Sequence, residues 1–209
     1  MIRHGQSVAN EQKRFAGHSD FDLTDLGKEQ ARSAGEYIYK NYKVDAIYAS
    51  DLRRAYKTAI PAAELFGLPI TKEKGLRELF VGEWETLEYT QVAREYPEDY
   101  DVWLNNYPFA RCTEGESVNE LYHRVVDCVL GLAKENDGKT ILIATHATPV
   151  RAFGCKAMGL PPEKMSEAPT PVNAAICVFE VENDTASVVK YNITEHLTKD
   201  QVTELGFKY

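Results

Sequence analysis

The sequence has few cysteines and lacks the spacings typical of a metal or redox site. Only 4 of its 209 residues are cysteine, and Cys112, Cys128, Cys155 and Cys177 form no CxxC pair. The 5 histidines include no pair at the i,i+4 spacing that binds a metal from one helix face. We therefore expect buried, reduced thiols and neither a metal nor a cofactor.

Long apolar runs and an excess of positive charge are also missing. No window approaches the roughly 20 apolar residues of a membrane span, and the N-terminus lacks the basic start and apolar core of a signal peptide. The 24 Lys+Arg against 32 Asp+Glu give a net charge of −8, which repels nucleic acid and anionic lipid. We expect a cytoplasmic protein that binds neither nucleic acid nor membrane, so any phosphate site must be a local basic pocket.

The apolar residues recur in a pattern of helices interleaved with buried strands. Thr24 and Asp51 stand where helix N-caps are expected, and the run TILIAT at 140–145 is typical of a strand covered on both faces. This order predicts a three-layer α/β/α sandwich around a mostly parallel sheet. Expected helices cover 24–42, 51–66, 86–95, 117–134 and 149–158, and expected strands cover 44–49, 68–76, 140–145, 174–181 and 186–193.

One segment interrupts this pattern. Residues 77–112 are irregular and rich in aromatic residues, with one short helix that Pro97 is expected to stop. The length of the chain suits a single core. We predict that residues 1–209 form one domain, in which residues from about 77 to 112 are an inserted cap over the active site.

Two histidines follow strand-like segments and point to chemistry on a phosphate. His4 stands between Arg3 and Gly5, and His146 directly follows the apolar run. Ligands of open α/β sheets bind beyond the carboxyl ends of strands, so both histidines are expected at one site, with Arg54 leaning toward it. Arginine matches phosphate oxygens, and a neutral imidazole can accept a phosphoryl group. Each residue also has a structural interpretation: a terminal residue, a core histidine or a surface cation.

Six segments in order resemble the histidine phosphatase superfamily, also called phosphoglycerate mutase-like proteins. Together they span nearly the whole chain. They are RHGQSVAN at 3–10, RFAGHSDFDLTDLGKEQA at 14–31, SDLRRAYKTA at 50–59, LRELFVGEWE at 76–85, EGES at 114–117 and ATHATPVRA at 144–152.

The resemblance implies a phosphohistidine mechanism. His4 would attack phosphorus, and water would then release inorganic phosphate. Arg3, Arg54 and His146 match the family's phosphate clamp, whose charge makes a magnesium ion unnecessary. Attack requires a lone pair on one ring nitrogen of His4, while the other nitrogen donates to an acceptor, expected to be a nearby backbone carbonyl.

Further residues match the family's pattern. Glu78 matches the proton donor that a leaving alkoxide needs, with Glu83 and Glu85 as competitors within a few residues. The adjacent Arg53 is expected to be solvated, in contrast to Arg54. Four positions match where the family contacts phosphate with an amide side chain or backbone groups: Asn10, Ala16, Gly17 and Ala147.

The chain also departs from the family's pattern. Only Met1 and Ile2 precede Arg3, so the first strand is expected to be very short unless residues are missing before Met1. Ala16 stands where glutamine is common, Thr86 where glycine is common, and residues 147–149 where Gly-Gly-Val is common. These changes leave the charged residues in place but weaken any prediction of substrate.

The charge of residues 86–112 guides the choice of reaction. This segment has 2 arginines and 5 carboxylates, or 2 − 5 = −3, which should repel the second phosphate of a mutase substrate. We therefore predict a phosphomonoesterase of the histidine acid phosphatase type that hydrolyses a small phosphorylated metabolite, with a homodimer as a candidate assembly. Phosphoglycerate mutase-type transfer and a catalytically weak protein that binds phosphorylated ligands are the alternatives.

Overall fold

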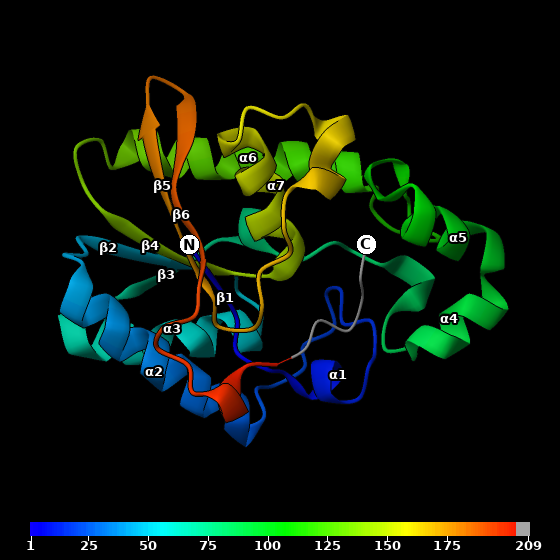
Figure 1. The fold of residues 1–209 in the computed structure, drawn as a ribbon, viewed down its shortest axis with the longest axis horizontal. Helices are drawn as coiled ribbons and strands as arrows, with labels where there is room; N and C mark the ends of the chain where they lie inside the picture. Colours follow the sequence, from blue (N-terminus) through cyan, green and yellow to red (C-terminus); the bar gives the residue numbers. More distant parts are fainter. Residues whose placement is uncertain (204–209) are drawn as a thin grey trace.

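A computed structural model describes residues 1–203 and has a six-stranded sheet with helices on both faces (Figure 1). The strand order is β3-β2-β4-β1-β5-β6. The first four strands in this order are parallel to one another, whereas β5 runs antiparallel to both of its neighbours, β1 and β6. This confirms the predicted α/β/α sandwich. The strands are β1 Ile2–Arg3, β2 Ala46–Ala49, β3 Ile70–Lys72, β4 Ile141–Thr145, β5 Ile176–Glu182 and β6 Thr185–Ile193.

Four long helices cover the two faces of the sheet. Helices α2 Asp25–Asn41 and α3 Arg53–Phe66 lie on one face, and α6 Val118–Glu135 and α7 Ala147–Ala157 on the other (Figure 1). Consecutive residues of β4 serve both cores, because Leu142 packs with α2 and α3 whereas Ile143 packs with α6 and α7. The other helices are α1 Val8–Glu11, α4 Tyr89–Glu95, α5 Pro97–Asn105 and the 3-10 turns η1 Lys74–Leu76, η2 Gly82–Trp84, η3 Tyr107–Phe109, η4 Pro162–Glu167 and η5 Lys199–Gln201.

Local sequence signals explain where these helices begin and end. Thr24 accepts a hydrogen bond from the Gly27 N–H and starts α2 as predicted, while Gly67 ends α3 in the left-handed conformation. The predicted cap at Asp51 is wrong. Leu52 is the N-cap of α3, and the Asp51 carboxylate instead accepts two hydrogen bonds, of 2.7 and 2.6 Å, from Arg77.

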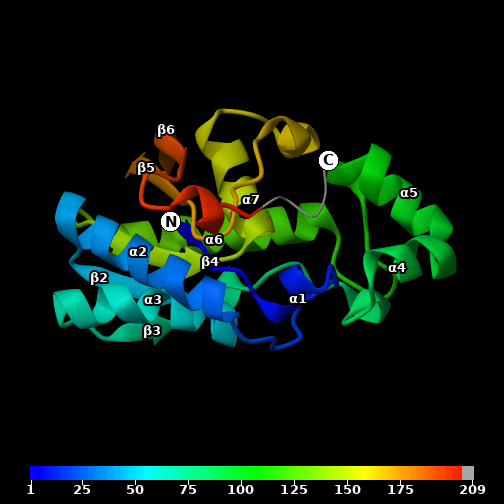
Figure 2. The same ribbon diagram turned by 60° about the horizontal axis from the view of Figure 1, so that its bottom comes forward.

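Helices α4 and α5 lie together at one end of the molecule, away from β2 and β3 (Figures 1 and 2). Pro97 separates them, but it starts α5 as well as ending α4, because proline suits the first turn of a helix. Residues 77–112 pack on Phe15 through Trp84 and Trp103, whose ring centroids lie 5.1 and 5.7 Å from the centroid of the Phe15 ring. The aromatic residues of this segment therefore form mainly a core, of which Trp103 also reaches the pocket described below.

The first strand is as short as the sequence suggests, yet it is paired on both sides. Ile2 pairs with Ala144 of β4 and with Ile176 of β5, and Arg3 pairs with Thr145. Within residues 1–203, no helix combines the length and hydrophobicity that a membrane span requires.

A close backbone contact joins α2 to the segment that follows β1. A Cβ atom at Gly27 would overlap the Gln6 carbonyl oxygen, and a Cβ atom at Gly5 would overlap the Gly27 carbonyl oxygen. Gly131 in α6 has open space around its Cα. Gly27 and Gly131 both lie in helices, but only Gly131 has room for a Cβ atom.

Replacing Gly27 with alanine should lower the free energy of unfolding by about 2 kcal/mol, because the added methyl group forces the two backbones apart. Gly131→Ala is the matched control and should raise the same free energy by about 0.5 to 1 kcal/mol through helix propensity. Urea denaturation followed by circular dichroism measures both. Equal effects of the two substitutions would contradict the close contact.

Candidate active site

A pocket of about 360 Å³ opens beyond the carboxyl ends of the parallel strands. His4 follows β1, His146 follows β4, and Arg54 lies in the first turn of α3 after β2. Of the nine predicted site residues, His146 is the one that does not itself line this pocket. The predicted residues that line it are Arg3, His4, Asn10, Ala16, Gly17, Arg54, Glu78 and Ala147.

The ring of His4 is held in one tautomer. Its Nδ1 lies 2.7 Å from the Gly5 carbonyl oxygen, and since a carbonyl can only accept, Nδ1 carries the proton and Nε2 keeps its lone pair. The prediction of a backbone acceptor is confirmed. His4 is only 3% exposed. Burial, with the charges of Arg54 and Arg3, holds the pKa of His4 well below its ordinary value, so the ring is neutral at pH 7.

His146 lies beside His4 rather than on the pocket wall. The two ring centroids are 5.2 Å apart, and His146 is fully buried. Its Nε2 is 2.8 Å from the hydroxyl of Ser50, and its Nδ1 has no hydrogen-bond partner within residues 1–203. Burial and the charge of Arg54 also hold the pKa of His146 well below its ordinary value. The contact between Ser50 and His146 was not predicted from the sequence.

The two arginines of the site are oriented by neutral carbonyl groups. Arg3 donates to the Pro171 carbonyl at 2.7 Å, and Arg54 donates to the carbonyls of Ser19 and Gly17 at 2.9 and 2.8 Å. Burial lowers the pKa of Arg54 to about 10, so it stays charged at neutral pH. Arg53 is exposed and pairs with Asp20, so its predicted solvation is confirmed.

Of the three candidate acids, Glu78 alone lines the pocket among the described residues. One oxygen of Glu78 accepts from the Leu79 N–H at 2.9 Å, and the other is 3.5 Å from the Thr148 N–H in the first turn of α7. Glu83 is exposed. Glu85 accepts from the backbone N–H groups of His18 and Ser19, both at 2.7 Å, and also from the Ser19 hydroxyl. Glu85 therefore supports the loop at 16–19 rather than facing the pocket.

The remaining predicted residues offer hydrogen-bond donors or close backbone approach. The Oδ1 of Asn10 accepts from Ser7 and from the Asn173 side chain, which leaves its Nδ2 group as the donor for a ligand. Gly17 has φ +45°, and a Cβ atom there would overlap the Glu85 carboxylate. Ala147 is the first residue of α7, at the positive end of its dipole. Asn173, which also donates to the His4 carbonyl at 3.1 Å, was missed because it lies far from every motif.

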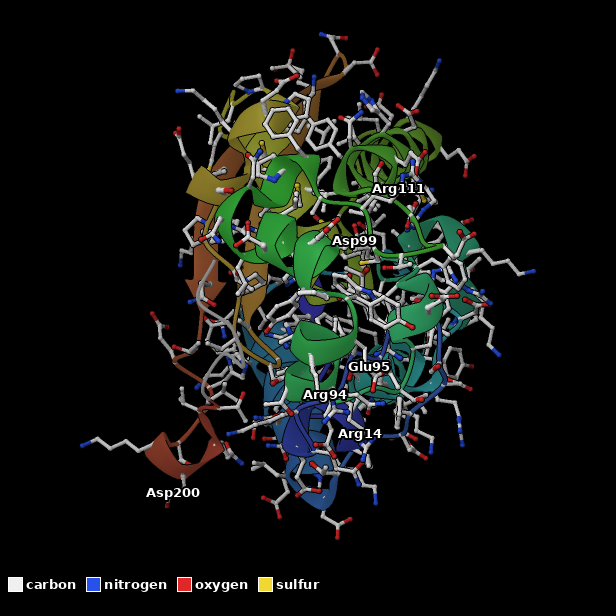
Figure 3. All side chains as sticks on the ribbon, turned by 90° about the vertical axis from the view of Figure 1, so that its right-hand side faces the viewer. Arg14, Arg94, Glu95, Asp99, Arg111 and Asp200 are labelled. Carbon is white, nitrogen blue, oxygen red and sulfur yellow. The ribbon has the colours of Figure 1, made fainter. Side chains whose placement is uncertain are left out.

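The pocket lining differs from the prediction that the negative charge of residues 86–112 acts on the site. Among the described lining residues there are four cations, Arg3, Lys13, Arg14 and Arg54, and one carboxylate, Glu78. None of the five carboxylates of residues 86–112 is among the described lining residues. They lie outside the pocket, where Glu88 pairs with Arg14, Glu95 with Arg94, and Asp99 bonds the Thr113 hydroxyl (Figure 3). The pocket thus attracts anions in spite of the negative segment beside it.

The four cysteines are free thiols that differ in burial. Cys112, Cys155 and Cys177 are buried free thiols as predicted, whereas Cys128 is only partly buried. Over residues 1–203, no three His, Cys, Asp or Glu side chains gather as a group able to hold a metal ion.

Substituting Glu85 with glutamine should weaken the loop at 16–19, because the amide would set an N–H group against a backbone N–H. We expect the free energy of unfolding to fall by about 1 to 3 kcal/mol and inorganic phosphate to bind more weakly. Glu83→Gln, two residues away and exposed, is the matched control and should stay within about 0.5 kcal/mol. Calorimetry of unfolding and of phosphate binding on both variants tests this. An unchanged phosphate affinity in Glu85→Gln would contradict the conclusion that Glu85 holds the loop at 16–19 in place.

Known proteins are similar to this chain in sequence and in fold. A family model described as "Histidine phosphatase superfamily (branch 1)" matches residues 1–194. Phosphoserine phosphatase 1 of Hydrogenobacter thermophilus is 31% identical over 197 residues, which are 94% of this chain and 92% of that protein. The metal-independent phosphoserine phosphatase of Arabidopsis thaliana is 26% identical over 99% of this chain and 86% of that protein. The solved structure of a mycobacterial glucosyl-3-phosphoglycerate phosphatase with VO3 has a TM-score of 0.85 and 27% identity, and the match covers 93% and 98% of the two chains.

Proposed function

Because the chain belongs to the histidine phosphatase superfamily, we propose that this phosphomonoesterase hydrolyses a small phosphorylated metabolite through a phosphohistidine formed on His4. One observation carries the proposal. His4 is a buried, neutral imidazole whose Nδ1 is hydrogen-bonded to the Gly5 carbonyl, so its Nε2 lone pair is available in a pocket that the guanidinium groups of Arg3 and Arg54 also line.

In the first step the Nε2 lone pair of His4 attacks phosphorus, and the bond from phosphorus to the ester oxygen breaks. The leaving oxygen takes the electron pair of that bond and a proton from the carboxyl group of Glu78. Arg3, Arg54 and the N-terminus of α7 stabilise the negative charge on the transferring group. Since carbonyl groups already orient both guanidiniums, little rearrangement is needed as this charge moves.

In the second step water replaces the alcohol. Glu78, now ionised, takes a proton from the water, whose oxygen attacks phosphorus while the phosphorus–nitrogen bond breaks. The electron pair of that bond returns to Nε2, so His4 is again neutral and Glu78 again protonated. The two steps therefore restore the enzyme and release inorganic phosphate.

Mutase-type transfer is the less favoured alternative, because the chain is similar to two phosphoserine phosphatases and to a glucosyl-3-phosphoglycerate phosphatase. A small phosphorylated substrate suits a pocket of about 360 Å³. The acid-phosphatase subclass, the cytoplasmic location, the homodimer and the cap formed by residues 77–112 stay predictions.

Replacing His4 with alanine should lower kcat for p-nitrophenyl phosphate by roughly a thousandfold, because the nucleophile is lost. Mass spectrometry after rapid quenching of the unsubstituted protein should find the phosphoryl group on the peptide that contains residue 4. Arg53→Ala, a change of an exposed arginine, is the control and should keep kcat within about twofold. Near-normal turnover by His4→Ala would rule out the covalent intermediate.

Replacing Glu78 with glutamine should slow esters of poor leaving groups more than p-nitrophenyl phosphate, since nitrophenolate departs without a proton. We expect kcat to fall by roughly a hundredfold for an alkyl phosphate and by less than about tenfold for the nitrophenyl ester. Glu83→Gln should change neither rate. Equal losses for both esters would contradict the role of Glu78 as the acid.

A further inference from the structure

Among the described lining residues, Lys13 is the one cation that is neither used by the proposed reaction nor part of an ion pair. It lines the same pocket as His4, and none of the ion pairs within residues 1–203 includes it. Arg14 differs, because its guanidinium donates to the Glu88 carboxylate at 3.0 Å and to the Thr86 carbonyl at 2.8 Å. The charge of Arg14 is thus largely balanced, whereas that of Lys13 is available to a ligand.

The backbone at Lys13 is held in a conformation that disfavours lysine. Its φ is +53°, in the left-handed region, where residues other than glycine and asparagine cost about 1 kcal/mol or more. Two hydrogen bonds fix it there: the Lys13 N–H donates to the Asn10 carbonyl at 3.2 Å, and the Lys13 carbonyl accepts from the Tyr89 N–H at 3.1 Å. The side chain is exposed, so packing does not repay this cost.

Lys13 lies at the exposed part of the pocket, because it is exposed whereas Arg3, His4 and Arg54 are buried. Lys13 follows α1 and is joined to the start of α4 through Tyr89, which also lines the pocket. Figure 3 shows the neighbouring Arg14 where the N-terminal segment meets the helices of residues 89–105. Since the residues that would hold the phosphate are buried, a leaving alcohol extends from them toward the exposed part of the pocket, where Lys13 lies.

We propose that Lys13 binds a carboxylate on the leaving alcohol, so that the enzyme prefers phosphate esters of hydroxy acids over esters of neutral or cationic alcohols. The proposal rests on the proposed function. One ammonium group matches the single charge of a carboxylate, whereas a second dianionic phosphate calls for a larger set of donors. Thr170, which lines the same pocket, can donate a hydrogen bond from its hydroxyl without adding charge.

Phosphoserine and phosphoethanolamine test this, because they differ only by a carboxylate. The measured quantity is the ratio of kcat/KM for phosphoserine to kcat/KM for phosphoethanolamine. Lys13→Asn should lower this ratio roughly five- to tenfold through loss of a charged hydrogen bond, and Lys13→Glu should lower it further by repulsion. Asparagine tolerates positive φ, so Lys13→Asn should not lower the melting temperature, and a lost ratio cannot then be ascribed to unfolding.

Lys139→Asn is the matched control, because Lys139 is an exposed lysine before β4, at the opposite end of the sheet from the pocket. The Lys139→Asn variant should have the same ratio of the two kcat/KM values as the unsubstituted protein. A ratio unchanged by both Lys13→Asn and Lys13→Glu, in protein that hydrolyses p-nitrophenyl phosphate, would overturn the role of Lys13 and leave the proposed function intact. If the unsubstituted protein hydrolyses none of the three esters, the proposed function fails, and this inference fails with it.

Discussion

The site depends on the parallel pairing of β1 with β4. Arg3 pairs with Thr145, and the N–H of His4 donates to the Thr145 carbonyl at 2.9 Å, so the two histidines leave adjacent strands at the same level. Their ring centroids are 5.2 Å apart for this reason, although they lie far apart in the sequence. Because Ile2 also pairs with β5, a strand of two residues is held on both sides and keeps this register.

Burial and positive charge act together on the reactive imidazole. His4 and Arg54 are almost completely buried, and the fixed guanidinium charge further disfavours a proton on the ring of His4. If a carboxylate rather than carbonyls bound the guanidinium of Arg54, it would cancel the charge that a phosphate needs. The carbonyl partners of Arg54 orient its guanidinium without neutralising it. This arrangement suits both the neutral imidazole of the proposed mechanism and the binding of a dianionic phosphate.

The layers of the fold were predictable because their signals are local. The Thr24 cap, the apolar run of β4 and the turn between β5 and β6 each lie within a few residues of sequence. The motif residues were predictable by resemblance. Contacts between distant segments were not, which is why Ser50 beside His146 and Asn173 beside Asn10 were missed. The net charge of a segment also does not show which way its side chains point. For this reason the carboxylates of residues 86–112 were wrongly expected to act on the pocket.

The cations of the pocket are of two kinds: Arg3 and Arg54 are suited to raising the reaction rate, and Lys13 to selecting the substrate. Arg3 and Arg54 face the group whose charge is redistributed as the phosphorus bonds change, so their interaction can strengthen in the transition state. A carboxylate on the leaving alcohol keeps the same charge throughout the reaction. A contact from Lys13 to that carboxylate would hold substrate and transition state about equally, and it would discriminate between esters without speeding the chemical step. The exposed, conformationally costly Lys13 and the buried, carbonyl-bound Arg54 thus meet different physical requirements of one reaction.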